Sequence, residues 1–217
     1  KILAFMEIEG VEIDSKFLKS LSSKFEKKIQ KLEKEVFKIS KKEFNIASPK
    51  QLGEIIYNDL KIAGLKKTKK GSFATSASVL EDLAFKGHEF PKLILDWRQV
   101  SKLKNTYSDA LPEHLNPNTK RVHTSFLLAA TTTGRLASSD PNLQNIPIKS
   151  EDGKDIRKAF TAKKGHLLIS ADYNQIEMRI LADLADVKEL KKAFKNKEDI
   201  PVSYTHLRSH ETKANLV

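Results

Sequence analysis

The sequence predicts an α+β fold, in which a helical first part precedes a second part with antiparallel strands packed by helices. Two observations carry this prediction. Between Asp14 and Glu43 there is no Gly or Pro, and apolar residues recur at helical spacing. After Pro117 the composition changes, because residues 121–133 are rich in Thr, Val and Phe, which favour strands. The helical part is expected to end near residue 90.

Composition indicates a basic protein with an anionic partner. The chain has 217 residues, and 39 Lys and Arg against 28 Asp and Glu give a formal net charge of +11. Such a surplus favours nucleic acid, with an ordinary Lys-rich surface as the alternative. No apolar run approaches the ~18 residues of a membrane span, and the apolar start is too short for a signal peptide. The absence of Cys excludes disulfides and thiolate metal sites and indicates the cytoplasm.

The longest predicted helix covers residues 14–43. Its apolar residues form a narrow seam, which is typical of an amphipathic helix. The members of the seam are Leu18, Phe25, Leu32 and Ile39, with Ile29 and Val36 between them. A stand-alone coiled coil is the alternative, but the repeat stops after roughly four heptads.

Two shorter helices are predicted to follow. Ser48 and Pro49 have the form of an N-cap and a first helical position, and they open a helix to about Leu60. Thr75 or Ser76 can cap another helix to about Phe85. A basic loop lies between them, and both a solvated turn and a phosphate-contacting loop are open interpretations. Its cations are Lys66, Lys67, Lys69 and Lys70.

A fourth helix is predicted from Pro91 to about residue 108. The buried side would consist of Leu93, Ile94, Trp97, Val100, Leu103 and Tyr107. Arg98 and Lys102 are four residues apart and share a different face.

The second part mixes strands with one helix. The predicted strands cover residues 121–133, 156–162 and 166–171, and residues 134–147 are predicted to form an ordered polar loop. From Gln175 to Ala185, apolar residues at helical spacing predict a helix.

Asp172 stands where the last predicted strand ends and this helix begins. A rigid strand end can present a ligand to a cleft, and carboxylate oxygens suit Mg²⁺. The alternative is that Asp172, three residues before Gln175, caps the helix. Asp is far commoner as a cap than as a catalytic ligand, so this segment alone favours the cap.

Residues 133–147 bring several hydrogen-bond donors into one polar stretch. Arg135, Gln144 and Asn145 suit the minor groove of a duplex, where every base pair offers acceptors. Such contacts sense pairing geometry without reading sequence. The alternative is a loop held by its own Asn and Ser hydrogen bonds.

Both segments resemble those of the family A DNA polymerases, the DNA polymerase I class. Residues 172–179 read D-Y-N-Q-I-E-M-R and are similar to motif A of that family. Residues 133–147 are similar to its T-G-R-L-S-S-x-D-P-N-L-Q-N-I-P segment. Four further segments fit in order, and the resemblance covers residues 1–200. These segments are residues 6–14, 44–52, 103–107 and 121–124.

The resemblance implies a domain organisation. A lead-in segment would cover residues 1–13, a helical DNA-gripping thumb residues 14–90, and a partial palm with motif A residues 91–200. After Ile200 the pattern breaks, and residues 201–217 resemble the translation of a sequencing-library adapter. We interpret them as a non-native tail, with a genuine divergent tail as the alternative.

The resemblance also implies an activity, which is template-directed DNA synthesis in DNA replication or repair. Asp172 would bind both catalytic Mg²⁺ ions, and the Tyr173 carbonyl would bind the nucleotide-side ion. Glu177 would press against the sugar of the incoming deoxynucleotide and disfavour a 2′-hydroxyl. The duplex contacts would be Arg98, Lys102, Lys104, Arg135, Asn142, Gln144 and Asn145, together with the basic loop at residues 66–70. The partners would be a template–primer duplex and deoxynucleoside triphosphates, bound by a monomer.

The family's second bridging carboxylate lies in a His-Asp-Glu motif, and no such tripeptide occurs in this sequence. The fingers helix that holds the triphosphate is also absent. We therefore predict that the isolated chain does not polymerise DNA and that its palm sheet has an exposed edge. The rival interpretations are a non-catalytic DNA-binding module and a ribonucleotide-using relative, and Glu177 argues against the latter.

Overall fold

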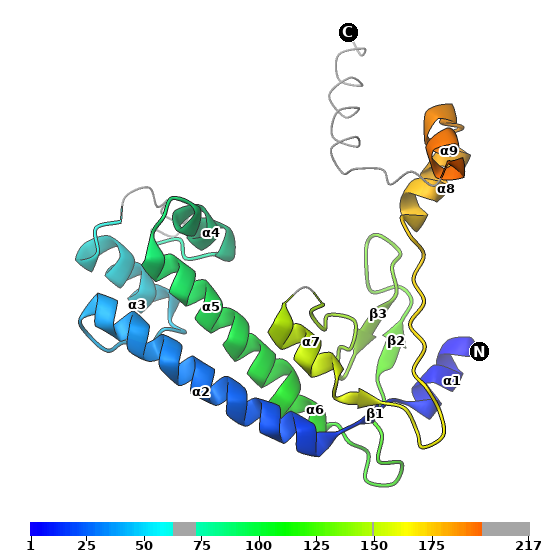
Figure 1. The fold of residues 1–217 in the computed structure, drawn as a ribbon, viewed down its shortest axis with the longest axis horizontal. Coiled ribbons are helices and arrows are strands. Elements are labelled where there is room, and N and C mark those ends of the chain that lie inside the picture. The colour runs from blue at the N-terminus through cyan, green and yellow to red at the C-terminus, as the bar shows by residue number, and fades with distance from the viewer. Residues whose placement is uncertain (63–72, 149, 197–217) are drawn as a thin grey trace. The chain divides into compact units, whose positions relative to one another are not determined.

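One long helix, α2 (Ser15–Ser40), organises the first of two units, Lys1–Leu167, and the second unit begins at Leu168. The computed structural model describes residues 1–62, 73–148 and 150–196. The fold is α+β, as predicted (Figure 1). Of the described helices, none combines the length and the apolar character that crossing a membrane requires.

Helix α2 begins within one residue of the predicted start and ends three residues before the predicted end. The Asp14 carboxylate accepts a hydrogen bond from the Phe17 amide at 2.9 Å and so caps the first turn. Lys41, at φ 56°, ends the helix in a left-handed conformation. Its buried seam includes Leu18 and Phe25, which are both 0% exposed. The predicted amphipathic helix is therefore confirmed.

The two shorter helices are also confirmed. Helix α3 (Pro49–Glu54) continues into a π-helical segment, η1 (Ile55–Asp59). The Ser48 hydroxyl accepts a hydrogen bond from the Gln51 amide at 3.4 Å, so Ser48 is the predicted cap. Helix α4 (Ala77–Phe85) follows Ser76 and buries Leu80 and Leu83.

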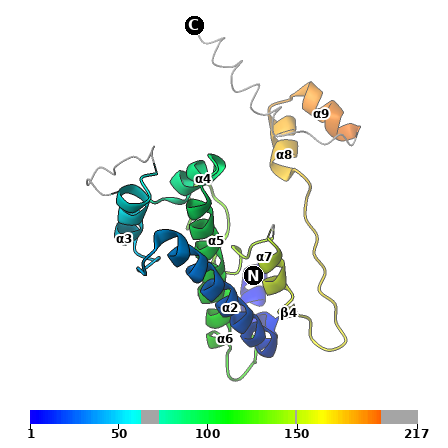
Figure 2. The same ribbon diagram turned by 60° about the vertical axis from the view of Figure 1, so that its left-hand side comes forward.

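Helix α5 (Glu89–Leu103) runs back along α2, as both views show (Figures 1 and 2). It begins two residues before the predicted start and continues as a π-helical segment, η2 (Lys104–Asp109), and a short helix, α6 (Ala110–Glu113). Two apolar clusters fill the space between α2 and α5. One, around Phe25, Leu103 and Tyr107, also includes Val122 and Ile156. The other joins Val36 and Ile94 to side chains of α3, η1 and α4.

The strands of the first unit are short. A first helix, α1 (Ile2–Glu9), leads into β1 (Glu12–Ile13), which pairs antiparallel with β4 (Phe160–Thr161). Strand β2 (Ser125–Leu127) pairs antiparallel with β3 (Ala137–Ser139). Gly10, at φ 63°, joins α1 to β1, and an added Cβ would lie 2.7 Å from the Val122 carbonyl oxygen. Only glycine therefore fits this approach of the two chain segments.

Two strand predictions and one loop prediction are wrong in extent. Within residues 121–133, only β2 forms a strand, because only this stretch meets a partner, and Val122 makes isolated bridges. The predicted loop at residues 134–147 contains that partner, β3. Of the predicted strand 156–162, only β4 forms, and Ile156 and Arg157 instead end helix α7 (Glu151–Arg157). Its Ser150 cap, acidic first turn and basic last turn are local helix signals that outweigh Ile156 and its neighbours.

The third predicted strand, residues 166–171, does not form. Leu167 and Ile169 are 88% and 89% exposed. A strand exists only through the ladder it makes with a neighbour, and no described strand pairs with this stretch. The helix after it is confirmed as α8 (Ile176–Leu184), and α9 (Lys188–Lys195), which the sequence did not predict, packs against it through Leu190.

Two ion pairs fasten α7 to α2. The ammonium of Lys24 lies 2.7 Å from the Asp155 carboxylate, and that of Lys28 lies 2.5 Å from Asp152. The hydrogen bonds from Lys158 and Lys24 hold the pKa of Asp155 below its ordinary 3.8. The stabilisation by this carboxylate is therefore present above the unfolded-state pKa and is lost as the pH falls through the folded-state pKa.

This linkage gives a testable pH dependence. We expect Asp155→Asn to lower the melting temperature at about pH 7, and this loss to shrink as the pH is lowered through the folded-state pKa, because the wild-type carboxylate then becomes protonated as well. Thermal unfolding followed by circular dichroism at pH values above and below that pKa checks this. An equal loss of melting temperature above and below it would show that Asp155 acts through packing and not through its charge.

Candidate nucleic-acid interface

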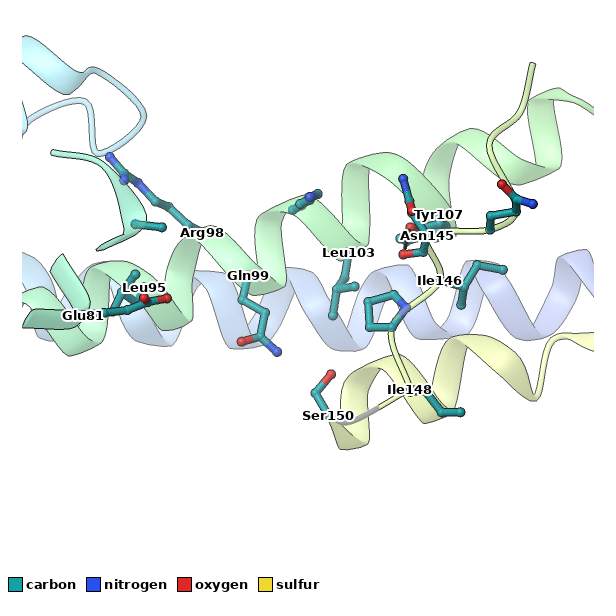
Figure 3. A pocket seen from close by; sticks show the side chains of 14 residues that line it. Glu81, Leu95, Arg98, Gln99, Leu103, Tyr107, Asn145, Ile146, Ile148 and Ser150 are labelled. Atoms are coloured by element: carbon teal, nitrogen blue, oxygen red, sulfur yellow. Dashed lines mark hydrogen bonds between the residues drawn. The ribbon is translucent and has the colours of Figure 1, made fainter. Parts of the chain in front are cut away.

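An open groove of about 850 Å³ runs along α5. Its α5 side includes Arg98, Gln99 and Leu103, and the facing side is the segment that leads into α7, with Asn145 and Ile146 (Figure 3). Four residues predicted to contact a duplex line this groove. They are Arg98, Lys102, Gln144 and Asn145. The fold therefore brings the cations of one helix to the amides of a segment that is remote in sequence.

Arg98 has a structural contact as well as its place in the groove. Its Nη1 donates a hydrogen bond to the Thr75 carbonyl at 2.6 Å, which ties the segment before α4 to α5. Burial lowers the pKa of Arg98, but a guanidinium stays charged in proteins. Lys102 lies one turn further along α5 and is exposed. The two cations can therefore meet consecutive phosphates along the groove.

The backbone of the facing segment is held by the protein. The Tyr107 hydroxyl donates to the Asn145 carbonyl at 2.5 Å, and Arg157 donates to the Ile146 and Pro147 carbonyls at 3.3 and 3.4 Å. The side chains of Gln144 and Asn145 are exposed. Their amide groups are therefore presented from a fixed backbone, as minor-groove contacts require.

Lys104 does not line the groove. Its ammonium lies 2.8 Å from Asp109 and 3.5 Å from Glu26, and its side chain is 19% exposed. The hydrogen bond to Asp109 raises the pKa of Lys104 above its ordinary 10.5. The structure thus places this predicted duplex contact in an ion-pair network that joins η2 to α2.

Arg135 and Asn142 lie outside this groove. Arg135 is exposed in the connection between β2 and β3, next to Gly134 at φ 72°. The Asn142 side chain accepts a hydrogen bond from the Gln144 amide at 3.0 Å and so shapes the turn before the groove segment. The predicted basic loop, with Lys66, Lys67, Lys69 and Lys70, lies outside the described residues, as does the predicted tail.

Sequence reasoning missed two buried hydroxyls beneath this turn. Thr124 and Ser138 lie with their oxygens 2.6 Å apart, and Thr124 also donates to the Pro141 carbonyl at 2.8 Å. The Leu143 amide donates to the Ser138 hydroxyl at 3.1 Å. These bonds join β2 to residues 138–143. Both residues belong to the family-like segments, which was the only signal available.

In the second unit, Asp172 lies in an extended segment before α8. Asp172 and Tyr173 are exposed. Helix α8 begins at Ile176, its N-cap position is Gln175 at φ 52°, and no side chain makes a capping hydrogen bond there. The interpretation of Asp172 as a helix cap is therefore wrong.

Two further residues of this unit belong to the same segment. Glu177 is exposed in the first turn of α8. Arg179 donates to the Asn174 carbonyl at 2.8 Å, and its guanidinium lies 4.5 Å from the centre of the Phe194 ring. These contacts fasten the segment after Asp172 to α8 and α9.

The donor set at Asp172 fits part of a magnesium site. In proteins that act on phosphate-containing substrates, Mg²⁺ is usually held by one or two carboxylates together with waters and substrate phosphates. Asp172 offers one exposed carboxylate, and the Tyr173 carbonyl offers a second hard oxygen. Across residues 1–62, 73–148 and 150–196, no cluster of three or more His, Cys, Asp or Glu residues could hold a metal ion. The described residues therefore offer oxygens that suit a metal ion at Asp172 but form no complete set of ligands there.

Comparisons with known proteins give the family of this chain. The model of DNA polymerase family A matches residues 15–211, and so extends into the segment predicted to be a non-native tail. DNA polymerase I of Rhizobium leguminosarum is 53% identical over 199 residues, which is 92% of this chain and 20% of that protein. DNA polymerase I of Caldicellulosiruptor bescii is 49% identical over 199 residues, which is 92% of this chain and 23% of that protein.

A solved structure gives the same result. The POL domain of Pol1 from M. smegmatis, in complex with DNA primer-template and dNTP, matches with a TM-score of 0.81 at 39% sequence identity. The match covers 91% of this chain and 35% of that chain. The chain thus spans about a fifth of the length of the curated relatives that it matches.

Proposed function

The chain belongs to DNA polymerase family A, and we propose on this premise that it serves template-directed DNA synthesis, with deoxynucleotides added to a primer 3′-hydroxyl. The observation that carries the proposal is the groove along α5, where Arg98 and Lys102 face Gln144 and Asn145. Residues 14–90 would act as the thumb and residues 91–200 as part of the palm. The protein would work as a monomer in the cytoplasm, in DNA replication or repair.

The groove suits a template–primer duplex. Cations give affinity for phosphates without reading sequence. Amide donors on a fixed backbone can test whether the terminal base pairs have the correct shape, because every pair offers minor-groove acceptors in similar places. The related M. smegmatis structure holds DNA primer-template and dNTP, which supports both as partners of this chain. Arg135 and Asn142 would add contacts from the β2–β3 connection and the turn after β3.

The chemistry would depend on the second unit. Asp172 and the Tyr173 carbonyl would hold divalent metal, and Glu177 would exclude a 2′-hydroxyl from the sugar position. When bound, Mg²⁺ supplies acidification of the primer hydroxyl and neutralisation of the leaving pyrophosphate. Arg179, through the Asn174 carbonyl, keeps the segment after Asp172 attached to α8.

Lys102 tests the groove directly. We expect Lys102→Gln to weaken binding of a duplex uniformly across sequences and to reduce the slope of log affinity against log salt by about 0.9, the value for one phosphate contact. Fluorescence anisotropy with a labelled primer–template duplex, over a series of salt concentrations, measures both quantities. Lys34→Gln is the matched control, because Lys34 is an exposed lysine that does not line the groove. Equal salt slopes for the two variants would show that Lys102 contacts no phosphate and that the groove does not bind the duplex.

The purified chain alone is expected to bind duplex without extending the primer. The described residues bring no cluster of carboxylates to Asp172, so among them there is no complete metal site. Primer extension with labelled deoxynucleotides is the measurement, and Asp172→Ala is the control for contaminating polymerase. Template-dependent incorporation by the wild-type chain that Asp172→Ala abolishes would contradict the expectation of inactivity.

A further inference from the structure

We propose that Tyr107 is a positioning residue, whose hydroxyl fixes the backbone of residues 144–147 so that the Gln144 and Asn145 amides meet the terminal base pairs of the duplex. The proposal rests on the proposed function of the groove as a duplex-binding surface. From the sequence, Tyr107 is predicted only to lie on the buried side of the helix that begins at Pro91.

The hydroxyl of Tyr107 is a hydrogen-bond donor on an otherwise apolar side chain of the core. Tyr107 is 3% exposed, and its hydroxyl donates at 2.5 Å to the carbonyl of Asn145, 38 residues further along the chain. Figure 3 shows the two residues meeting at the groove. Burial raises the pKa of Tyr107, which keeps the hydroxyl protonated and able to donate. Deleting the hydroxyl would leave the Asn145 carbonyl without this donor.

The position of Tyr107 is set by the π-helical turn that carries it. Segment η2 widens the helix after α5, and Asp109 fastens it to α2 by accepting a hydrogen bond from Ser22 at 2.5 Å, while Lys104 of the same segment donates to Asp109 at 2.8 Å. Although burial opposes the effect, the bonds from Lys104 and Ser22 hold the pKa of Asp109 below its ordinary 3.8. Short π-helical segments inside helices are frequently found at functional sites. Lys104 is thus part of the ion-pair network that holds η2, the segment that carries Tyr107.

The rest of this backbone segment is also held by hydrogen bonds from side chains. Three consecutive carbonyls, those of Asn145, Ile146 and Pro147, accept hydrogen bonds from side chains of η2 and α7. Helix α7 also approaches closely at Gly153, where an added Cβ would lie 2.7 Å from the Pro147 carbonyl oxygen. The backbone is thereby bound to the protein along one side, while the Gln144 and Asn145 side chains remain exposed. Of these three bonds, that of Tyr107 is made to the backbone of Asn145, one of the two residues whose amides would read the duplex.

Tyr107→Phe isolates the hydroxyl, because the ring that fills the core remains. Tyr57→Phe is a matched control from the same unit. The Tyr57 ring stacks on Phe73 at 3.8 Å between centroids, and its buried hydroxyl has no hydrogen-bond partner within the described ranges. Both variants remove one buried tyrosine hydroxyl, but only Tyr107→Phe removes a bond to the groove segment.

The first measurement is duplex binding by the purified full chain, with fluorescein-labelled primer–template whose terminal pair is either matched or mismatched. We expect Tyr107→Phe to weaken binding of the matched duplex about 5-fold, the equivalent of one hydrogen bond. Binding of the mismatched duplex and the salt slope should stay unchanged, so that discrimination falls. A merely structural role would lower the active fraction of protein and leave discrimination intact. Discrimination at the wild-type level in Tyr107→Phe would overturn the proposal.

The second measurement needs no DNA. Hydrogen exchange followed by mass spectrometry should show faster exchange of residues 143–148 in Tyr107→Phe and wild-type exchange there in Tyr57→Phe. Unchanged exchange in Tyr107→Phe would overturn the positioning role. A wild-type chain that binds no duplex would overturn the proposed function of the groove instead, and the exchange result would still decide whether Tyr107 holds the segment.

Discussion

Replacing Phe25 by Ala should lower the free energy of unfolding by about 3–5 kcal/mol, the usual cost of emptying a large aromatic site in a core. Phe25 is 0% exposed and stands in the cluster that joins α2 to α5, Val122 and Ile156. The substitution therefore removes contacts with several elements at once. A loss of this size is a large fraction of the stability of an ordinary domain. Urea denaturation followed by circular dichroism measures it.

Phe85→Ala is the matched control for this prediction. Phe85, the last residue of α4, is 94% exposed, so its removal should change the free energy of unfolding by no more than about 0.5 kcal/mol. The same chemical change is thus made once inside and once outside the core. Similar losses in the two variants would mean that α2 and α5 do not pack as described.

The helices of the first unit were predictable because their signals are local. Asp14 and Ser48 each supply a capping oxygen three residues before the amide that they bind, and the spacing of Leu18 and Phe25 reports the buried face directly. Such signals act within a few turns of chain, so the sequence alone is sufficient to place α2 and α3.

The strands were less predictable because pairing is long-range. Ile13 finds its partner Phe160 almost the whole length of the unit away, and no local pattern specifies that register. Residues 167–169 have the composition of a buried strand but are exposed, since composition cannot supply a partner. At Ile156 and Arg157, where the sequence predicted the start of a strand, the helix that Ser150 caps forms instead.

The candidate site also has a part that the sequence predicted and a part that depends on packing. The resemblance to known polymerase segments identified Arg98, Lys102, Gln144 and Asn145, and the structure brings these together in one groove. It could not distinguish Lys104, which pairs with Asp109, from Lys102, because side-chain partners depend on the packing of α2 against η2. The hydroxyl bond of Tyr107 was invisible for the same reason.

Asp172 is the residue on which the proposed chemistry depends. In a polymerase completed with the remaining segments of a relative, Asp172→Asn keeps the size of the side chain and removes the negative charge that metal binding requires. Stabilisation of charge by bound metal is worth several kcal/mol, so synthesis should fall by about 10³-fold or more, while duplex affinity changes little. Asp172 is exposed and makes no helix cap, so the fold should tolerate the change.

The measurement that tests this account most directly is the single-turnover rate of nucleotide incorporation by the completed enzyme, with and without Asp172→Asn, on the same primer–template. The account predicts that the wild-type enzyme extends the primer and that the amide variant binds the duplex normally but incorporates about a thousandth as fast or slower. An amide variant that incorporates deoxynucleotides at the wild-type rate would contradict it.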